Sequence, residues 1–491
     1  MTDRPGSATA ASDEFGAAPA QPKRRRRGLW RRFWRYLLAV VGLLILAHLV
    51  LNIIAGRRLE AELSRIRAAG QPLTLAEAAP PKVPDAQNAA LLYQQAFNGL
   101  SKPEAHGEIA AAFYGLGTHE KSRPALAEVE AVLARHEADF RLLEEGSRRP
   151  ACRFPVNWEA GLAATCPHLA RVRLATRFLV AKALAEAERG RSGEALNDLG
   201  IVVRLTNHIS AEPTVIAQLM RVVCIAMMFY STPEILAAAP PSEMDSRALY
   251  DLLGTADTIS HFVRAVEGER ADQIQTFEQI RRAGPILLLS LPNPEVYPSS
   301  WVRRLARAWP VLHPFWEPFL KLDEVACLRF LREGIALARK PYAQSQAGLR
   351  RIEQEHQNSP WYAVLSPPLA RALTPVSSRG LHLREHQALA MTRLLRGALA
   401  LRAYQIEHGD YPASLGELRA RGGWAIPDDP FPGKPFIYRR EGKGYLLYSV
   451  GPDETDNGGL TESAAWLKAW QKGVHPTPEQ YQYDIPLRMT R

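Results

Sequence analysis

One five-residue pattern in the chain has the residue types and the spacing for metal-dependent hydrolysis. His382-Leu383-Arg384-Glu385-His386 reads H-x-x-E-H. In the inverzincin pattern, two histidines four positions apart share a helix face and bind zinc, while the glutamate acts as the base. His382 and His386 are therefore candidate zinc ligands and Glu385 a candidate catalytic base, with Glu462 as the residue to examine as a third ligand. Because so short a pattern also arises by chance, we expect these residues to lie on a solvated helix face, with zinc hydrolysis as the alternative.

Other catalytic signatures are absent from the sequence, which has no P-loop, no G-x-G-x-x-G after a strand and no G-x-S-x-G elbow. The four cysteines include no C-x-x-C pair, which argues against a zinc ribbon. Cys152 and Cys166 could form a disulfide in an oxidising compartment, and Cys224 and Cys327 lie in apolar helical contexts typical of buried thiols. The residues assign no catalytic activity, and a non-enzymatic protein is the primary hypothesis.

A basic and aromatic segment precedes a long apolar run near the N-terminus. Eight Lys and Arg residues and three aromatic residues lie within 23–35, and the twenty residues from Tyr36 to Ala55 carry no charge. At about 1.5 Å per residue this run spans about 30 Å, the thickness of the hydrocarbon core of a bilayer. It is longer than the apolar part of a cleavable signal peptide, and Arg57 and Arg58 follow it directly. The pattern predicts a retained signal-anchor helix.

The charge distribution predicts the orientation of this helix. Residues 1–36 hold nine Lys and Arg against three acidic residues, a net +6 of the total +10, so the other 455 residues share only +4. The positive-inside rule then places the N-terminus in the cytoplasm and the chain beyond residue 56 outside it, in a bacterial inner membrane. The expected partners are the lipid bilayer and other envelope proteins. The near-neutral body argues against nucleic acid.

Helical patterns dominate the middle of the chain. Residues 167–189 and 194–209 are two apolar-periodic segments separated by Gly190-Arg191-Ser192-Gly193, and a third begins at Pro213. The first two segments resemble one hairpin of a tetratricopeptide-like array, although the 34-residue signature does not recur. We therefore expect a stack of antiparallel helices. The Pro- and Trp-rich segment 284–320 has two interpretations, a loop packed across this body or an element resting on the bilayer surface.

The C-terminal part changes character. A long helix is predicted from Leu381 to His408, followed by a short helix that Ser414 caps. Two strands are predicted next, at Phe436–Tyr438 and Tyr445–Val450, and a Gly-containing turn joins them. This arrangement predicts an antiparallel hairpin.

The order of these pieces resembles the major pseudopilin of type II secretion, the G-type subunit. The matching residues are Ala403-Tyr404, His408-Gly409, Tyr411-Pro412, Leu415, Leu418, Asp429-Pro430, Gly433, Pro435, Tyr438, Tyr448-Ser449, Gly451-Pro452-Asp453 and Gly458-Gly459. The likeness covers about 75 residues and implies a fold. No prepilin peptidase site precedes Tyr36 or Leu381, so assembly into a pseudopilus is not expected.

The resemblance also implies a calcium site in the loop after the last strand, with Asp453 and Asp456 as the ligands. The local Asp-x-Thr-x-Asn-Gly rhythm offers hard oxygen donors around a tight turn. Calcium is the one cofactor that the residues suggest. The alternative is a plain Asx- and Gly-rich turn.

The sequence thus predicts a mainly α protein with a single transmembrane helix, an extracytoplasmic antiparallel helical array and a small C-terminal α+β module, a long helix plus an antiparallel hairpin or meander. A membrane-anchored scaffold or binding protein is the first functional hypothesis, and a membrane-tethered zinc metallohydrolase is the alternative. The expected organisation is a basic tail (1–35), a signal-anchor (36–56), a juxtamembrane helix and Pro-rich linker (57–85), a helical body (86–380), a pseudopilin-like module (381–460) and a C-terminal tail (461–491).

Overall fold

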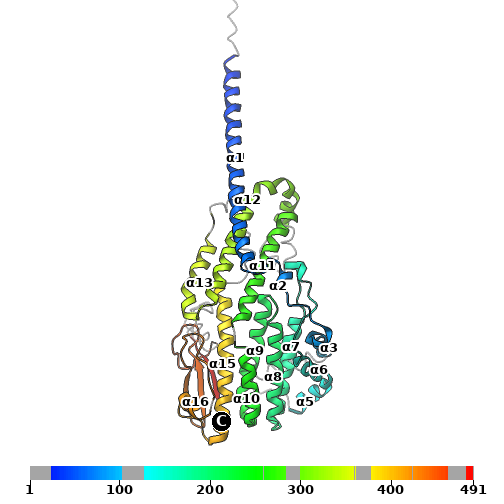
Figure 1. The fold of residues 1–491 in the computed structure, drawn as a ribbon, viewed down its shortest axis with the longest axis vertical. Helices are drawn as coiled ribbons and strands as arrows, with labels where there is room; N and C mark the ends of the chain where they lie inside the picture. The colour runs from blue at the N-terminus through cyan, green and yellow to red at the C-terminus, as the bar shows by residue number, and fades with distance from the viewer. Residues whose placement is uncertain are drawn as a thin grey trace, which may run out of the picture. The chain divides into compact units, whose positions relative to one another are not determined.

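The computed structural model describes residues 24–101, 126–257, 259–283, 299–358, 360, 378–422, 424–462 and 483–489. These residues are mainly helical and include one small antiparallel sheet, which confirms the predicted mainly α class (Figure 1). The chain divides into two compact units, Met1–Ile54 and Ala55–Arg491. The first helix is α1 (Arg24–Ala68).

Several helices begin at residues whose side chains cap them. Thr214 Oγ1 accepts the N–H of Ala217 at 3.3 Å, and the predicted cap Ser414 accepts the N–H of Glu417 at 3.2 Å. The helices after α1 are α2 (Leu75–Ala78), η1 (Asp85–Gln87), α3 (Ala89–Leu100), α5 (Leu126–Arg135), α6 (Glu137–Ser147), η2 (Trp158–Ala163), α7 (His168–Glu188), α8 (Ser192–Ile209), α9 (Val215–Ala238), α10 (Glu243–Thr255), α11 (Ser260–Ala283), α12 (Ser299–Ala338), α13 (Tyr342–Gln357), α15 (Ser378–His408) and α16 (Leu415–Gly422).

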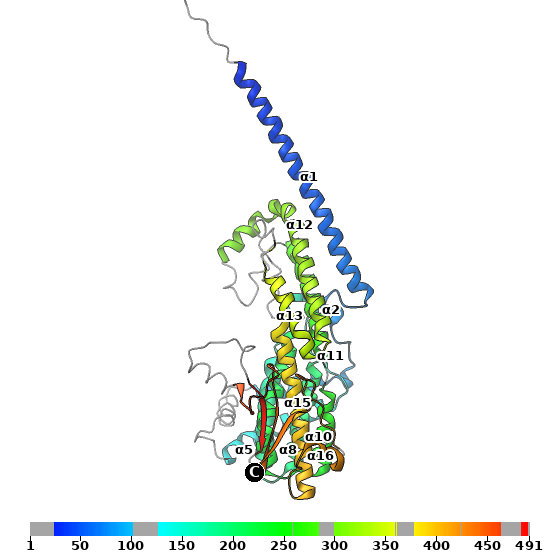
Figure 2. The same ribbon diagram turned by 90° about the vertical axis from the view of Figure 1, so that its left-hand side faces the viewer.

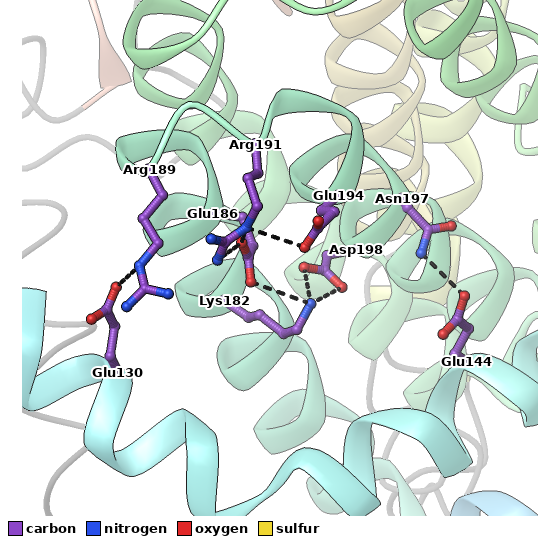
Figure 3. A network of polar contacts seen from close by, with 9 residues as sticks. All are labelled: Glu130, Glu144, Lys182, Glu186, Arg189, Arg191, Glu194, Asn197 and Asp198. Carbon is purple, nitrogen blue, oxygen red and sulfur yellow. Dashed lines mark hydrogen bonds and ion pairs between the residues drawn. The ribbon is translucent and has the colours of Figure 1, made fainter.

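Helices α7 and α8 form the predicted hairpin. Gly190 in the connecting turn has φ of 79°, a left-handed conformation that a residue with a side chain rarely adopts. A polar network joins the hairpin to α5 and α6 (Figure 3), and its centre is the ion pair between Lys182 Nζ and Asp198 Oδ2 at 2.7 Å. Burial raises the pKa of Asp198 to about 7 although Lys182 opposes the rise. Asn197 extends the network by donating to Glu144 at 3.3 Å.

Among the described residues, three large apolar clusters and a smaller fourth one fill the body. The largest is shared by α7–α10, α13, α15, α16 and the sheet, so the C-terminal module is continuous with the helical body instead of having a core of its own. A second cluster joins α3, α5 and α6 to α7–α9. A third joins α9 and α11–α13, and Trp309 and Trp316 of α12 belong to it. Residues 299–320, the described part of segment 284–320, therefore favour the interpretation in which this segment packs against the body. Residues 284–298 lie outside the described residues.

The sheet packs against α15 in both ribbon views (Figures 1 and 2). Its strands are β1 (Ile437–Glu441), β2 (Gly444–Ser449) and β3 (Ile485–Met489), in the order β1-β2-β3 and antiparallel throughout. The β1–β2 pair is the predicted hairpin, with Ile437 opposite Tyr448. The third strand was not predicted, since it lies in the segment expected to be a C-terminal tail.

None of the four cysteines, all of which lie in described parts of the chain, forms a disulfide in the structure. Cys224 and Cys327 are both fully buried, which confirms the prediction for this pair. Cys152 and Cys166 are not joined, and burial raises the pKa of both thiols.

Candidate functional site

Two described helices are long and apolar enough to cross a membrane, α1 from Trp30 and α9. The apolar residues of α1 between Trp30 and Ile54 are largely exposed, and none of its most apolar window is buried. More than half of the corresponding window of α9 is buried, and α9 carries the buried Arg221. This difference is expected if α9 is a core helix and α1 is a membrane anchor, because a core helix buries its apolar side chains against protein.

The C-terminal end of α1, from Ala55 onward, is part of the second unit and packs within it. Ala55, Leu59, Glu62 and Ile66 are buried, and their spacing of four, three and four residues places them on one helix face. Leu59 and Ile66 form a cluster with Ile274 of α11 and with Val325 and Leu328 of α12.

One polar residue lies in this buried face. Glu62 is 4% exposed, and it pairs with Arg65 Nη1 at 2.8 Å and with Arg332 Nε of α12 at 3.3 Å. The ion pair between Glu62 and Arg332 therefore adds a polar contact to the apolar cluster that the C-terminal end of α1 forms with α11 and α12.

The H-x-x-E-H residues form a buried cluster at the start of α15. His382, Glu385 and His386 are 0%, 1% and 5% exposed, so the expected solvated helix face is wrong. The ring of His382 stacks on Tyr342 of α13 with centroids 5.6 Å apart, and the ring of His386 lies 4.2 Å from that of His382. This face is covered because α9 and α13 pack on it.

Glu385 is engaged by another side chain. Its Oε1 forms a buried ion pair with Arg221 of α9, which is itself 1% exposed. A carboxylate held in a buried pair with a guanidinium is a structural contact. It is poorly placed to act as a general base, which must face the proton that it takes.

The two histidines are uncharged near neutral pH. Burial lowers the pKa of His382 to about 3, assisted by His386, and burial lowers the pKa of His386 to about 4, with Arg393 contributing. His386 Nδ1 lies 2.9 Å from the carbonyl oxygen of His382. Neutral imidazole is the form that binds zinc, but the nearby cations disfavour a metal ion.

Among the described residues, no third zinc ligand lies with the two histidines. Glu462 Oε1 lies 4.0 Å from Arg384 Nη1, on the exposed side of α15. Within the described parts of the chain, no group of three or more His, Cys, Asp or Glu side chains is arranged to hold a metal ion. The pattern therefore gives two buried histidines and an ion pair, without an evident hydrolytic centre.

The loop after β2 contains Asp453 and Asp456, the candidate calcium ligands. Asp453 accepts the side-chain amide of Asn457 at 3.0 Å, and Asp456 Oδ1 accepts both the hydroxyl of Tyr448 and the N–H of Gly458 at 2.8 Å. These contacts describe an Asx turn, in which the carboxylates accept bonds from their own loop. Calcium binding by these two residues remains a prediction.

Asp484, just before β3, organises the same loop and was missed by the sequence analysis. This residue is 1% exposed, and its carboxylate accepts the N–H groups of Asn457, Gly459 and Leu460 at 3.2, 2.6 and 3.2 Å. The backbone donors of the loop therefore point towards an anion, whereas a calcium loop directs oxygen atoms towards a cation. A separation of more than twenty residues hides this relationship in the sequence.

Asp429 plays a similar part in the Asp-Pro turn. Its carboxylate accepts the N–H of Phe431 at 3.1 Å, the hydroxyl of Ser449 at 2.9 Å and the N–H of Val450 at 3.0 Å. Burial raises its pKa to about 6, although these bonds oppose the rise. Asp429 thus ties the turn before β1 to the end of β2.

No protein-family model matches the chain, and no curated protein or solved structure matches it.

Proposed function

We propose that this chain is a single-pass, membrane-anchored protein of the bacterial envelope, with its N-terminus in the cytoplasm and its helical body on the outer side of the inner membrane. The observation that carries the proposal is α1, one continuous helix with an exposed apolar part and a C-terminal end buried in the body. An exposed apolar helix of this length is stable in lipid and costly in water.

The aromatic residues before the span support this placement. The rings of Trp30, Phe33 and Trp34 contact one another with centroids 5.9 to 6.2 Å apart and are all exposed. Aromatic side chains of this kind gather at the level of the lipid headgroups. Together with the basic residues of 23–35, they form the cytoplasmic flank of the anchor.

The body acts as a scaffold or binding element for other envelope proteins. This part of the proposal is supported by the helical hairpins, which expose extended surfaces in such arrays, and by the buried state of the H-x-x-E-H residues. The C-terminal module is pseudopilin-like: its long helix α15 is followed by an antiparallel meander, and its Asp-Pro turn is bonded to the Tyr448-Ser449 end of β2. The likeness concerns fold and carries no secretion role with it.

Reporter fusions to the full chain test the proposed topology. We expect alkaline phosphatase fused after residue 491 to be active and a green fluorescent protein fused there to be dark, with the opposite result at the N-terminus. Replacing the eight basic residues of 23–35 by Gln should mix or invert the orientation, because these charges hold the N-terminus inside. The matched Arg57→Gln/Arg58→Gln variant should keep the wild-type pattern. A fluorescent C-terminal fusion in the unmodified chain would refute the proposal.

Zinc analysis separates the scaffold from the metallohydrolase alternative. The purified full chain should contain far less than one zinc per molecule, and His386→Ala should leave its metal content unchanged. Stoichiometric zinc that is lost in His386→Ala would instead favour the membrane-tethered hydrolase that uses His382, Glu385 and His386.

A further inference from the structure

A line of oxygen donors follows one stripe of α11. Glu269, Asp272 and Thr276 are spaced by three and four residues, so they share one face of the helix. The N-terminus of α9 meets this stripe, since the backbone N–H of Val215 donates to Glu269. The short helix η2 also meets it, since Gln275 Nε2 donates to the carbonyl oxygen of Glu159 at 2.7 Å.

Three oxygen atoms of this group are buried and have no hydrogen-bond partner among the described residues: Asp272 Oδ1, Gln275 Oε1 and Thr276 Oγ1. Asp272 is 7% exposed and Thr276 is 0% exposed. A buried polar atom that loses water without gaining a partner is costly, and native proteins rarely keep several of them together. Three in one helical turn indicate that a ligand satisfies them.

Within the described parts of the chain, no cationic side chain pairs with the carboxylates of Glu269 and Asp272. Burial and the neighbouring Asp272 raise the pKa of Glu269 to about 7, and burial raises the pKa of Asp272 to about 6. The group that opposes this rise in the pKa of Glu269 is the backbone N–H of Val215, and it is not a cationic side chain. Buried carboxylates are normally paired or bound to a metal.

Gly161 of η2 leaves room next to these donors. An added Cβ would lie 3.3 Å from Asp272 Oδ1 and 3.0 Å from the side-chain amide of Gln275, so both groups converge on one point beside the glycine. Gly161 also has φ of 57° and ψ of −127°, a backbone conformation that side chains disfavour. The glycine therefore keeps the loop close to α11 without filling the space.

We propose that Glu269, Asp272, Gln275 and Thr276 bind a calcium ion between α11 and η2. Two carboxylates, an amide oxygen and a hydroxyl are hard oxygen donors, and calcium accepts such mixed sets with water completing its coordination. The site is separate from Asp453 and Asp456, and it needs no histidine. A bound divalent cation supplies the missing positive charge and ties the loop 152–167 to the body.

Two measurements on the full chain in detergent test the site. After removal of metal with EDTA, added CaCl₂ should raise Tm by on the order of 3 °C at a hundredfold excess over Kd, because calcium binds the native state. Terbium, which replaces calcium, should emit when tryptophan is excited, since η2 carries Trp158 three residues before Gly161.

Four variants identify the residues. Asp272→Asn should abolish both responses, and Thr276→Val should weaken calcium binding by about tenfold while the Tm in EDTA stays close to wild type. Trp158→Phe should dim the terbium emission and keep the calcium-dependent Tm shift. The control variant Asp453→Asn/Asp456→Asn should behave as wild type.

The proposal fails if calcium leaves the Tm of the wild-type chain unchanged. A Tm that responds to pH but not to calcium would also refute it, because the two carboxyl groups would then share a proton instead of binding a metal ion. It also fails if Thr276→Val and Asp272→Asn respond as wild type, or if the response is lost only in the Asp453→Asn/Asp456→Asn variant.

Discussion

Arg221 in the first third of α9 and Glu385 near the start of α15 form an ion pair in which both residues are 1% exposed. The pair joins a helix of the body to the first helix of the C-terminal module, across the apolar core that both share. Arg221 Nε also donates to Gln218 at 3.2 Å. The two charges are thus held by a network that fixes α15 against α9.

Removing one partner of this pair should destabilise the protein more than removing both. Arg221→Met leaves the Glu385 carboxylate buried and unpaired, so we expect a loss of about 3–5 kcal/mol in the free energy of unfolding. The double variant Arg221→Met/Glu385→Leu replaces the pair by apolar groups of similar size and should recover much of this loss. Thermal and denaturant unfolding of the full chain in detergent measure both. Additive losses would show that the two residues act independently.

His386 should make the protein sensitive to acid. Its pKa is about 4 in the folded chain, mainly through burial, against about 6.5 in an unfolded chain. Between these values the unfolded state binds a proton that the folded state does not, so stability falls as pH falls through this window. The expected contribution is about 1.4 kcal/mol per pH unit.

The variant His386→Gln isolates this contribution. Its Tm should fall less steeply than that of the wild type between pH 6.5 and 4.5, and the difference between the two curves should be constant above pH 7.5, where neither state is protonated. Parallel curves over the whole range would show that His386 is solvated or remains protonated in the folded chain.

Several helix boundaries follow from local sequence signals, whereas the burial of the H-x-x-E-H residues does not. Pro167, the Gly190 turn and the Ser414 cap mark helix ends through backbone conformation and capping, which are local effects. The exposure of His382 and His386 depends on whether α9 and α13 cover that face of α15. Because these contacts join residues far apart in the chain, helical spacing alone could not distinguish a covered face from a solvated one.

Asp484 should be essential for the loop that follows β2. Asp484→Asn replaces an acceptor oxygen by a donor amide in front of backbone N–H groups, so we expect a loss of about 3 kcal/mol. Hydrogen exchange should then accelerate at the amides of Asn457, Gly459 and Leu460. The matched variant Asp456→Asn should affect mainly the amide of Gly458, which Asp456 accepts. Unchanged exchange in Asp484→Asn would show that the loop is held by other contacts.

The role of Asp484 also shows what the resemblance to pseudopilins could and could not supply. The resemblance directs attention to Asp453 and Asp456, because the family binds calcium in the loop after its last strand and both residues lie in that loop. The backbone N–H groups of the loop face the carboxylate of Asp484. This residue directly precedes β3 and lies outside the matched residues. The pairing of β3 with β2 brings it there, and strand pairing over such a separation leaves no local signal in the sequence.

Gly397 should set how closely α15 approaches the sheet. An added Cβ would lie 2.8 Å from Leu447 Cδ2 of β2 and 3.4 Å from Ile426 Cδ1, so the helix packs directly over these side chains. Gly397→Ala should be nearly neutral, because the end of the Leu447 side chain can shift and alanine favours the helix. Gly397→Val should cost about 1–3 kcal/mol through overpacking.

Adding Leu447→Ala to Gly397→Val should make the double variant less destabilised than the sum of the two single changes, since it frees the space that valine needs. The free energy of unfolding of the four chains gives the coupling directly. Strict additivity would mean that Gly397 and Leu447 are not in contact and that another feature holds α15 against β2.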